Sequence, residues 1–195
     1  MQIVLGNIVR FNTRFLYDCV LGRASWNSSV KITPEAFGEL RFWNNSLRHL
    51  NSSGVEICNL DAENTFDFEV FCDASDVGFG GYFSACLDAR FESGEVFGNW
   101  HNHERVQSST WRELAGVQRT VRSFAKTFEN KRLIVSLDNK NVEHILKVGS
   151  SKMNLHGMAS DIRYNCKENN INLHAVWVPG EQNKKADGSI MMTGV

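Results

Sequence analysis

Four acidic residues stand in segments where a strand is expected to end or a helix to begin. They are Asp73 in FCDASD, Glu113 in STWREL, Asp138 in VSLDN and Asp187 in KKADG. Carboxylate oxygens suit Mg²⁺ and Mn²⁺ better than zinc, which favours nitrogen and sulfur ligands. Two such ions about 3.5–4 Å apart can activate a water molecule and stabilise the leaving oxygen when a phosphodiester is hydrolysed. The order of the four acids therefore predicts a two-metal nuclease site.

Each acid also has a purely structural explanation. Asp73 begins a run that is typical of a turn. Glu113 has the spacing of a capping box with a threonine three residues earlier, and Asp138 could cap the helix that follows it. Asp187 could be a solvated charge beside two lysines. The joint pattern nevertheless favours chemistry, because Asp73 and Asp138 follow apolar runs, FEVFC and LIVSL, that indicate buried strands.

Residues 1–64 are predicted to form a small helical segment followed by a linker. Apolar residues recurring at three and four positions indicate helices at 2–21 and 34–50. In the second helix, Thr33 is a natural N-cap and Pro34 suits the first helical position. Residues 65–195 are expected to form a separate domain.

Within residues 65–195 the periodicity first follows strands and then alternates between strands and helices. Period-two runs rich in aromatic and β-branched residues predict strands at 67–75, 78–87, 94–101, 132–138 and 171–178. Helical periodicity predicts helices at 110–129, 141–149 and 158–169. This order predicts an α/β fold with a mixed five-stranded sheet, three antiparallel strands followed by parallel ones, flanked by helices.

Composition limits the classes of protein without selecting one. The 195 residues are 42% hydrophobic and carry a formal net charge of −1, which suits one core and neither supports nor excludes a polyanionic substrate. An odd set of five cysteines without a C-x-x-C pair indicates a reducing compartment. Arg10 and Arg14 interrupt the apolar opening segment, so we expect no membrane span and no secretion signal, and a cytoplasmic or nuclear protein.

Four segments carry a resemblance to a known family. They are, in order, FCDASDVGFGGYF, QSSTWRELAGV, LDNKNVEHILKVGS and WVPGEQNKKAD. Together they resemble the ribonuclease H domain of retroelement reverse transcriptases, in the form found in DIRS-like retrotransposons. The resemblance covers residues 66–188 and implies a ribonuclease H-like fold. The preceding residues resemble the end of the polymerase thumb and the connection, and since no polymerase palm motif is present, the chain reads as a tail fragment of a longer polyprotein.

The resemblance also implies roles for the acids. Asp73, Glu113, Asp138 and Asp187 match the family's four catalytic, metal-binding residues. It implies two Mg²⁺ ions, for which Mn²⁺ may substitute, with Asp73 bridging them, Glu113 and Asp138 on the ion that activates water, and Asp187 at the edge of the site. The implied substrate is the RNA strand of an RNA/DNA hybrid, and the implied partner is the polymerase part of the parent polyprotein.

Short polar residues next to the acids are candidates for contacts with the hybrid. Reading 2′-hydroxyl groups across a shallow minor groove suits backbone groups and short polar side chains. Ser75, Ser109, Asn139 and Gln182 lie next to the acids and are the predicted substrate-binding residues. Each could equally serve as a helix cap or a turn residue.

Two departures from the family pattern bear on activity. The loop PGEQNKKAD lacks the histidine that cellular members carry before the last acid, so we expect slower turnover. Gly188 follows Asp187 where relatives continue a helix. The alternative function is therefore a catalytically inactive or domesticated remnant that binds nucleic acid or is merely structural. A proofreading exonuclease or an integrase fits less well, because Ser75 stands where the former needs an acid and Asp187 where the latter needs a glutamate.

Overall fold

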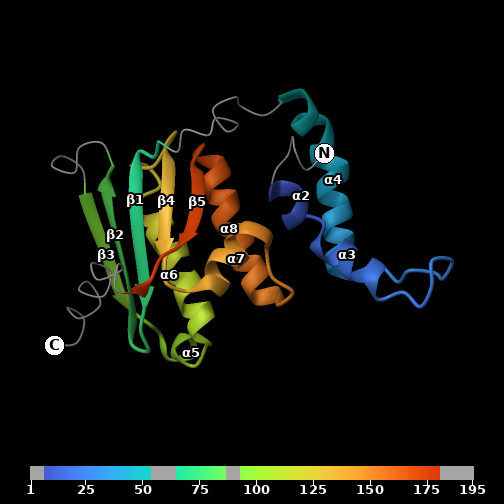
Figure 1. Ribbon diagram of the computed structural model, residues 1–195, viewed down its shortest axis with the longest axis horizontal. Coiled ribbons are helices and arrows are strands. Elements are labelled where there is room, and N and C mark those ends of the chain that lie inside the picture. Colours follow the sequence, from blue (N-terminus) through green and yellow to red (C-terminus); the bar gives the residue numbers. More distant parts are fainter. Residues whose placement is uncertain (1–6, 54–64, 87–92, 181–195) are drawn as a thin grey trace. The chain divides into compact units, whose positions relative to one another are not determined.

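The computed structural model describes residues 7–53, 65–86 and 93–180 (Figure 1). The described residues form two compact units. The helical unit contains residues 7–53 and 147–151, and the sheet unit contains residues 65–86, 93–146 and 152–180. None of the described helices combines the length and the apolar character that a membrane span requires.

The helical unit begins with two short helices and a long one. They are α2 (Asn7–Phe11), α3 (Arg14–Leu21) and α4 (Pro34–Ser53). The prediction for α4 is confirmed at its start, where the backbone N–H of Ala36 donates to Thr33 Oγ1 at 3.2 Å. The prediction of one helix over 2–21 is wrong, because the chain breaks between α2 and α3.

Two side chains of α4 explain this break. Glu39 is buried, and its carboxylate accepts the backbone N–H groups of Phe15 at 3.0 Å and Leu16 at 2.8 Å, which are unpaired donors at the start of α3. Trp43 Nε1 donates to the carbonyl oxygen of Asn12 at 2.7 Å. Burial raises the pKa of Glu39, so the carboxylate depends on these hydrogen bonds. The break is thus stabilised by tertiary contacts that local periodicity does not encode.

The sheet unit contains the predicted mixed five-stranded sheet. Its strands are β1 (Phe68–Ala74), β2 (Gly78–Ala85), β3 (Ser93–Asn99), β4 (Arg132–Leu137) and β5 (Asn172–Trp177). They lie in the order β3-β2-β1-β4-β5, with β1–β2 and β2–β3 antiparallel and β1–β4 and β4–β5 parallel (Figure 1). The predicted α/β architecture is confirmed.

Among the described residues, four more helices lie wholly or mostly in the sheet unit. They are α5 (Asn102–Arg105), α6 (Ser109–Ser123), α7 (Lys140–Val148) and α8 (Met153–Glu168). Only the last two residues of α7, Lys147 and Val148, belong to the helical unit. Helix α6 packs on β1 and β2, and α8 packs on α6 and β5. The sequence prediction missed α5 and started α8 too late.

The end of α6 differs from its prediction for a packing reason. The predicted helix ran to residue 129, because Phe124 and Phe128 continue its apolar spacing. The helix ends at Ser123, and turns follow. Within these turns, the rings of Phe124 and Phe128 both pack on Phe83, with centroid distances of 4.7 and 5.1 Å. The same residues are therefore buried without continuing the helix.

Helix α6 approaches β2 very closely at one position. Gly81 pairs with Cys72 of β1, and a Cβ atom at Gly81 would overlap the side chain of Thr120 on α6. Thr120 is fully buried and donates from Oγ1 to the carbonyl oxygen of Gly116 at 2.9 Å. The absence of a side chain at Gly81 is therefore what allows α6 to lie against the sheet.

We predict that Gly81→Ala destabilises the protein by about 1–3 kcal/mol, because the added methyl group has no space against Thr120. The measurement is the free energy of unfolding in urea. Gly157→Ala is the matched control: Gly157 is exposed on α8 with nothing within 4 Å of the added atom, so alanine should stabilise by about 0.5–1 kcal/mol. Equal effects of the two substitutions would contradict the tight packing of α6 on β2.

Candidate active site

The pairing of β1 with β4 brings Asp73 and Asp138 close together. These parallel strands pair from Phe68 with Leu133 to Phe71 with Ser136. The same register, continued by two residues, places Asp73 level with Asp138 at the carboxyl ends of adjacent strands. Neighbouring strands lie about 4.8 Å apart, and alternation puts both positions on one face of the sheet.

Helix α6 adds Glu113 to this pair of acids. The helix passes over the end of β1, where a Cβ atom at Gly116 would lie 3.6 Å from the carbonyl oxygen of Asp73. The pKa of Glu113 is raised to about 7, chiefly by burial and also by the negative charges of Asp138 and Asp73, while a hydrogen bond from Asn139 lowers it. Three of the four predicted acids therefore lie within electrostatic reach of one another.

The capping-box explanation of Glu113 is wrong. The N-cap of α6 is Ser108, whose Oγ accepts the backbone N–H of Trp111 at 3.3 Å. Glu113 lies beyond that first turn, and its Oε1 accepts a hydrogen bond from Asn139 Nδ2 at 3.0 Å. Its carboxylate is thus directed to the segment after β4 and not to the start of its own helix.

The helix cap proposed for Asp138 belongs to its neighbour. Asn139 Oδ1 accepts the backbone N–H groups of Asn141 at 2.9 Å and Val142 at 3.4 Å, at the start of α7. The same side chain donates to Glu113 from its Nδ2. Asn139 therefore caps α7, the alternative role that the sequence offered for it, and it connects α7 to α6 through a contact with Glu113 that sequence reasoning missed.

The remaining predicted residues differ in their placement. Ser75 Oγ accepts the backbone N–H groups of Val77 and Gly78, both at 3.2 Å, so it organises the β1–β2 turn. Ser109 is exposed at the start of α6. Gln182 and Asp187 lie outside the described residues.

Arg112 is a further residue of this region, and sequence reasoning did not predict its partners. Its side chain is only 12% exposed and donates to the carbonyl oxygen of Arg105 at 2.9 Å and to Asp76 Oδ1 at 2.5 Å. Asp76 lies in the turn that follows Asp73. Arg112 thus holds this turn against the segment before α6, and its partners are too distant in sequence for a local pattern to reveal them.

The end of β5 lies beside Asp138. Trp177 Nε1 donates to the carbonyl oxygen of Asp138 at 3.0 Å, and Leu137 pairs with Trp177 in the sheet. Three residues later, a Cβ atom at Gly180 would lie 3.7 Å from Asp138 Oδ2. The chain after β5 therefore passes the candidate site before it reaches residue 181.

The donor chemistry of the three acids fits an oxygen-liganded divalent ion. The described residues contain no group of three His, Cys, Asp or Glu side chains already placed as a metal-ligand set. Asp73, Glu113 and Asp138 nevertheless offer only oxygen donors, and the first and last of them raise the pKa of Glu113 by their charge. Mg²⁺ and Mn²⁺ suit such ligands, and a cation would offset this repulsion.

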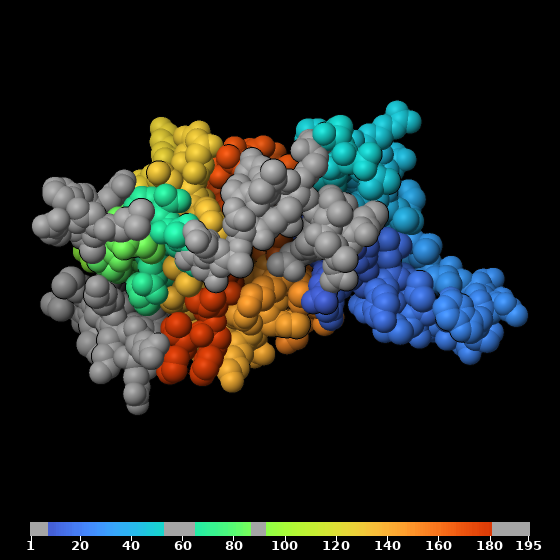
Figure 2. All heavy atoms as spheres, turned by 45° about the horizontal axis from the view of Figure 1, so that its top comes forward, coloured from blue at the N-terminus to red at the C-terminus, as the bar shows by residue number. Residues whose placement is uncertain are grey.

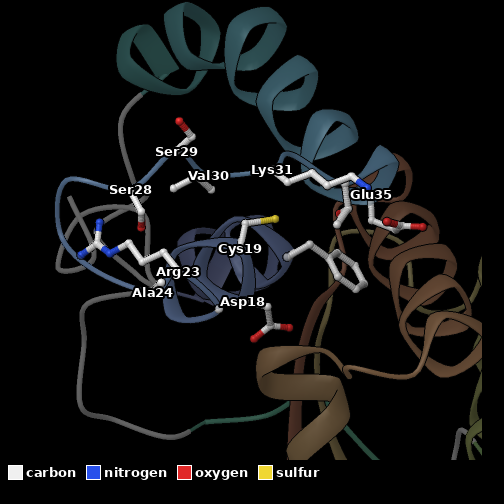
Figure 3. A pocket seen from close by; sticks show the side chains of 12 residues that line it. Asp18, Cys19, Arg23, Ala24, Ser28, Ser29, Val30, Lys31 and Glu35 are labelled. Carbon is white, nitrogen blue, oxygen red and sulfur yellow. The ribbon is translucent and has the colours of Figure 1, made fainter.

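A separate hollow lies on the helical unit and contains none of these acids (Figure 3). Its volume is about 520 Å³, and its charged lining residues are Asp18, Glu35, Arg23 and Lys31. Two acids and two bases give this lining no preference for an anion or a cation. The hollow is therefore a poorer candidate for phosphate chemistry than the acids of the sheet unit.

Comparison with solved structures identifies the architecture. RNase H1 from the halophilic archaeon Halobacterium salinarum NRC-1 matches with 14% identity and a TM-score of 0.50, over 63% of this chain and 92% of its own. LC11-RNase H1 in complex with an RNA/DNA hybrid matches with 14% identity and a TM-score of 0.51, over 64% of this chain and 94% of its own. The PFV RNase H domain matches with 12% identity and a TM-score of 0.50, over 68% of this chain and 96% of its own.

The chain has a ribonuclease H-like fold. No protein-family model matches it, and no curated protein does. Identities of 12–14% show the fold alone, and one fold can support several functions. In the ribonuclease H-like unit of this chain, Asp73, Glu113 and Asp138 come from β1, α6 and the end of β4, the places at which the sequence predicted them.

We predict that Glu113 makes the metal-free protein less stable as the pH rises. The unfolded chain ionises Glu113 near its ordinary pKa of 4.5, whereas the folded protein holds the proton to about pH 7. The stability that the protonated Glu113 side chain contributes to the folded protein is fully present below about pH 4.5 and is lost as the pH rises through about 7. Glu113→Gln removes this dependence. The free energy of unfolding of the variant, relative to that of wild type, should therefore rise by on the order of 1–3 kcal/mol from about pH 5 to about pH 8.5.

The measurement is urea unfolding with EDTA at both pH values. Glu129→Gln, at an exposed position beyond α6, is the control and should leave the pH dependence unchanged. A constant difference between wild type and Glu113→Gln across this range would contradict the raised pKa.

We also predict that Asn139→Ala raises the pKa of Glu113 further, because the variant lacks the amide that donates to its carboxylate. Loss of the α7 cap should in addition cost about 1 kcal/mol of stability. Titration of the Glu113 carboxyl group by NMR measures the first effect, and urea unfolding measures the second. Asn141→Ala, at an exposed position of the same helix, is the control. An unchanged Glu113 pKa in Asn139→Ala would contradict the contact.

Proposed function

We propose that this protein is a metal-dependent endonuclease that hydrolyses the RNA strand of RNA/DNA hybrids. The observation that carries the proposal is the convergence of Asp73, Glu113 and Asp138 from three separate elements of a ribonuclease H-like fold. LC11-RNase H1, which has the same fold, was solved in complex with an RNA/DNA hybrid. The four sequence segments that resemble retroelement ribonuclease H domains contain the same three acids.

The chain's own residues hold and orient the carboxylates in this proposal. Asp73 on β1, together with Glu113 and Asp138, would hold two Mg²⁺ or Mn²⁺ ions. Bound there, the ions would activate water and stabilise the leaving oxygen. Asn139 keeps the Glu113 carboxylate directed toward the end of β4 through its Nδ2.

Asp187 would supply the fourth carboxylate. It stands seven residues beyond Gly180, whose Cβ position is 3.7 Å from Asp138 Oδ2. A seven-residue segment can extend by up to about 24 Å, so reach does not prevent Asp187 from joining the other acids. Gln182, in the same segment, and Ser109, exposed at the start of α6, would contact the hybrid.

The origin of the domain forms part of the proposal. The order of the four segments that resemble retroelement ribonuclease H domains supports an origin as the ribonuclease H part of a retrotransposon reverse transcriptase. The helical unit would then be a thumb- or connection-like segment. The PFV RNase H domain shares the ribonuclease H-like fold of this chain. The polymerase part of such a reverse transcriptase would be the natural partner of this chain.

The test is cleavage of a labelled RNA/DNA hybrid in Mg²⁺ or Mn²⁺, with duplex DNA and duplex RNA as competing substrates. We predict cutting of the hybrid's RNA strand alone, and a loss of more than about 100-fold in Asp73→Asn, since even outer-shell changes at metal sites cost 10–100-fold. Asp161→Asn removes an exposed acid of α8 and is the matched control, with activity close to wild type.

The outcomes separate the two functions that the sequence leaves open. Metal-dependent cutting that disappears in Asp73→Asn and persists in Asp161→Asn would establish the nuclease. A folded protein that binds the hybrid without cutting it, at any concentration of either metal, would overturn the nuclease and leave the inactive remnant.

A further inference from the structure

An exposed tryptophan stands at the rim of the candidate site. Trp177 is the last residue of β5 and is 42% exposed, although its ring is large and apolar. The polar end of the ring is fixed, because Nε1 donates to the carbonyl oxygen of Asp138 at 3.0 Å. In the space-filling view, the red spheres, which belong to the last residues before 180, lie at the surface (Figure 2). The ring therefore has a defined orientation next to an acid of the site.

A lysine ammonium lies over this ring. Lys140 Nζ is 4.3 Å from the centroid of Trp177, a distance at which a cation is attracted by the electrons of the ring. Lys140 is exposed, begins α7 and follows Asp138 by two residues. Asn139, between them, is fixed by its bonds to α7 and to Glu113. The position of the ammonium group is thus set by the same elements that set the acids.

This lysine differs from the other cations near the site. Arg119 also lies over aromatic rings, but it is paired with Glu104. Arg112 is engaged by Asp76 and by the carbonyl oxygen of Arg105. Within the described part of the chain, no carboxylate forms an ion pair with Lys140. Its charge is therefore available to an anion from solution.

We propose that Trp177 holds the Lys140 ammonium in place as a binding site for a backbone phosphate of the nucleic-acid substrate, next to the acids that cut it. This inference rests on the proposed function. Three carboxylates without metal repel a polyanion, so a cation beside Asp138 offsets that repulsion where the strand must lie. A phosphate contact of this kind positions the strand and does not read its sequence. Trp177 is a positioning residue that acts through Lys140.

The test is hybrid binding across a series of salt concentrations. Fluorescence anisotropy of a labelled RNA/DNA hybrid is measured with EDTA, so that binding is observed without cleavage. Each phosphate neutralised contributes about 0.7–0.9 to the slope of log K against log salt concentration. We expect Lys140→Met to lower this slope by about 1 and to weaken binding about tenfold at low salt. Lys167→Met, an exposed lysine of α8, is the matched control and should do neither.

A double-variant cycle tests the role of Trp177. Trp177→Leu removes the ring and should weaken binding only while Lys140 is present, so Trp177→Leu combined with Lys140→Met should bind no more weakly than Lys140→Met alone. Trp177→Phe keeps an aromatic face without the N–H group and should retain most of the binding. Thermal unfolding of each variant shows whether it is folded under the assay conditions, and Trp177→Phe keeps the cycle informative should the leucine variant unfold.

The outcomes separate this inference from the proposed function. A wild-type chain that cuts the hybrid, with a slope that Lys140→Met leaves unchanged, would overturn the phosphate site alone. Additive losses in the double variant would overturn the coupling of Trp177 to Lys140. A wild-type chain that neither binds nor cuts the hybrid would overturn the proposed function together with this site.

Discussion

The parallel pairing of β1 with β4 is the constraint on which the candidate site depends. Its register sets Asp73 level with Asp138, and a slip of one residue would place the two carboxylates on opposite faces of the sheet. Glu113 joins them only because α6 lies directly against the sheet, where Gly81 offers no side chain to Thr120. The geometry of the acids is therefore a consequence of how strands and helix pack, and not of local loop structure.

Holding three like charges together destabilises the metal-free fold, and the surrounding contacts offset part of that effect. Burial and two neighbouring carboxylates raise the pKa of Glu113 to about 7, whereas the Asn139 amide lowers it. One oxygen of Asp73 accepts the backbone N–H of Ala74 at 2.7 Å, and Trp177 fixes the backbone at Asp138. These contacts orient the Glu113 carboxylate and hold the backbone at Asp73 and Asp138, so the acids are positioned by the groups around them.

The strands, and the placement of Asp73 and Asp138 at strand ends and of Glu113 on a helix, could be predicted, because apolar runs and helical spacing are local signals. The break between α2 and α3 could not, since it depends on Trp43 and its partner 31 residues away. The same holds for Asn139, whose contact with Glu113 spans 26 positions, and for Trp177, whose contact with Asp138 spans 39. Sequence patterns identified the residues that carry charge and missed the residues that hold them in place.

In the proposed function, charge would also couple the binding of metal and substrate at this site. Arg112 is a cation close enough to Glu113 to lower its pKa, yet it already forms an ion pair with Asp76. Without a divalent ion, the repulsion of a polyanion by Asp73, Glu113 and Asp138 would be offset in part by the Lys140 ammonium beside Asp138. A bound cation would both lower the proton affinity of Glu113 and attract the phosphate backbone, so metal and nucleic acid would each strengthen the binding of the other. Reciprocity of this kind follows from electrostatics alone and requires no conformational change.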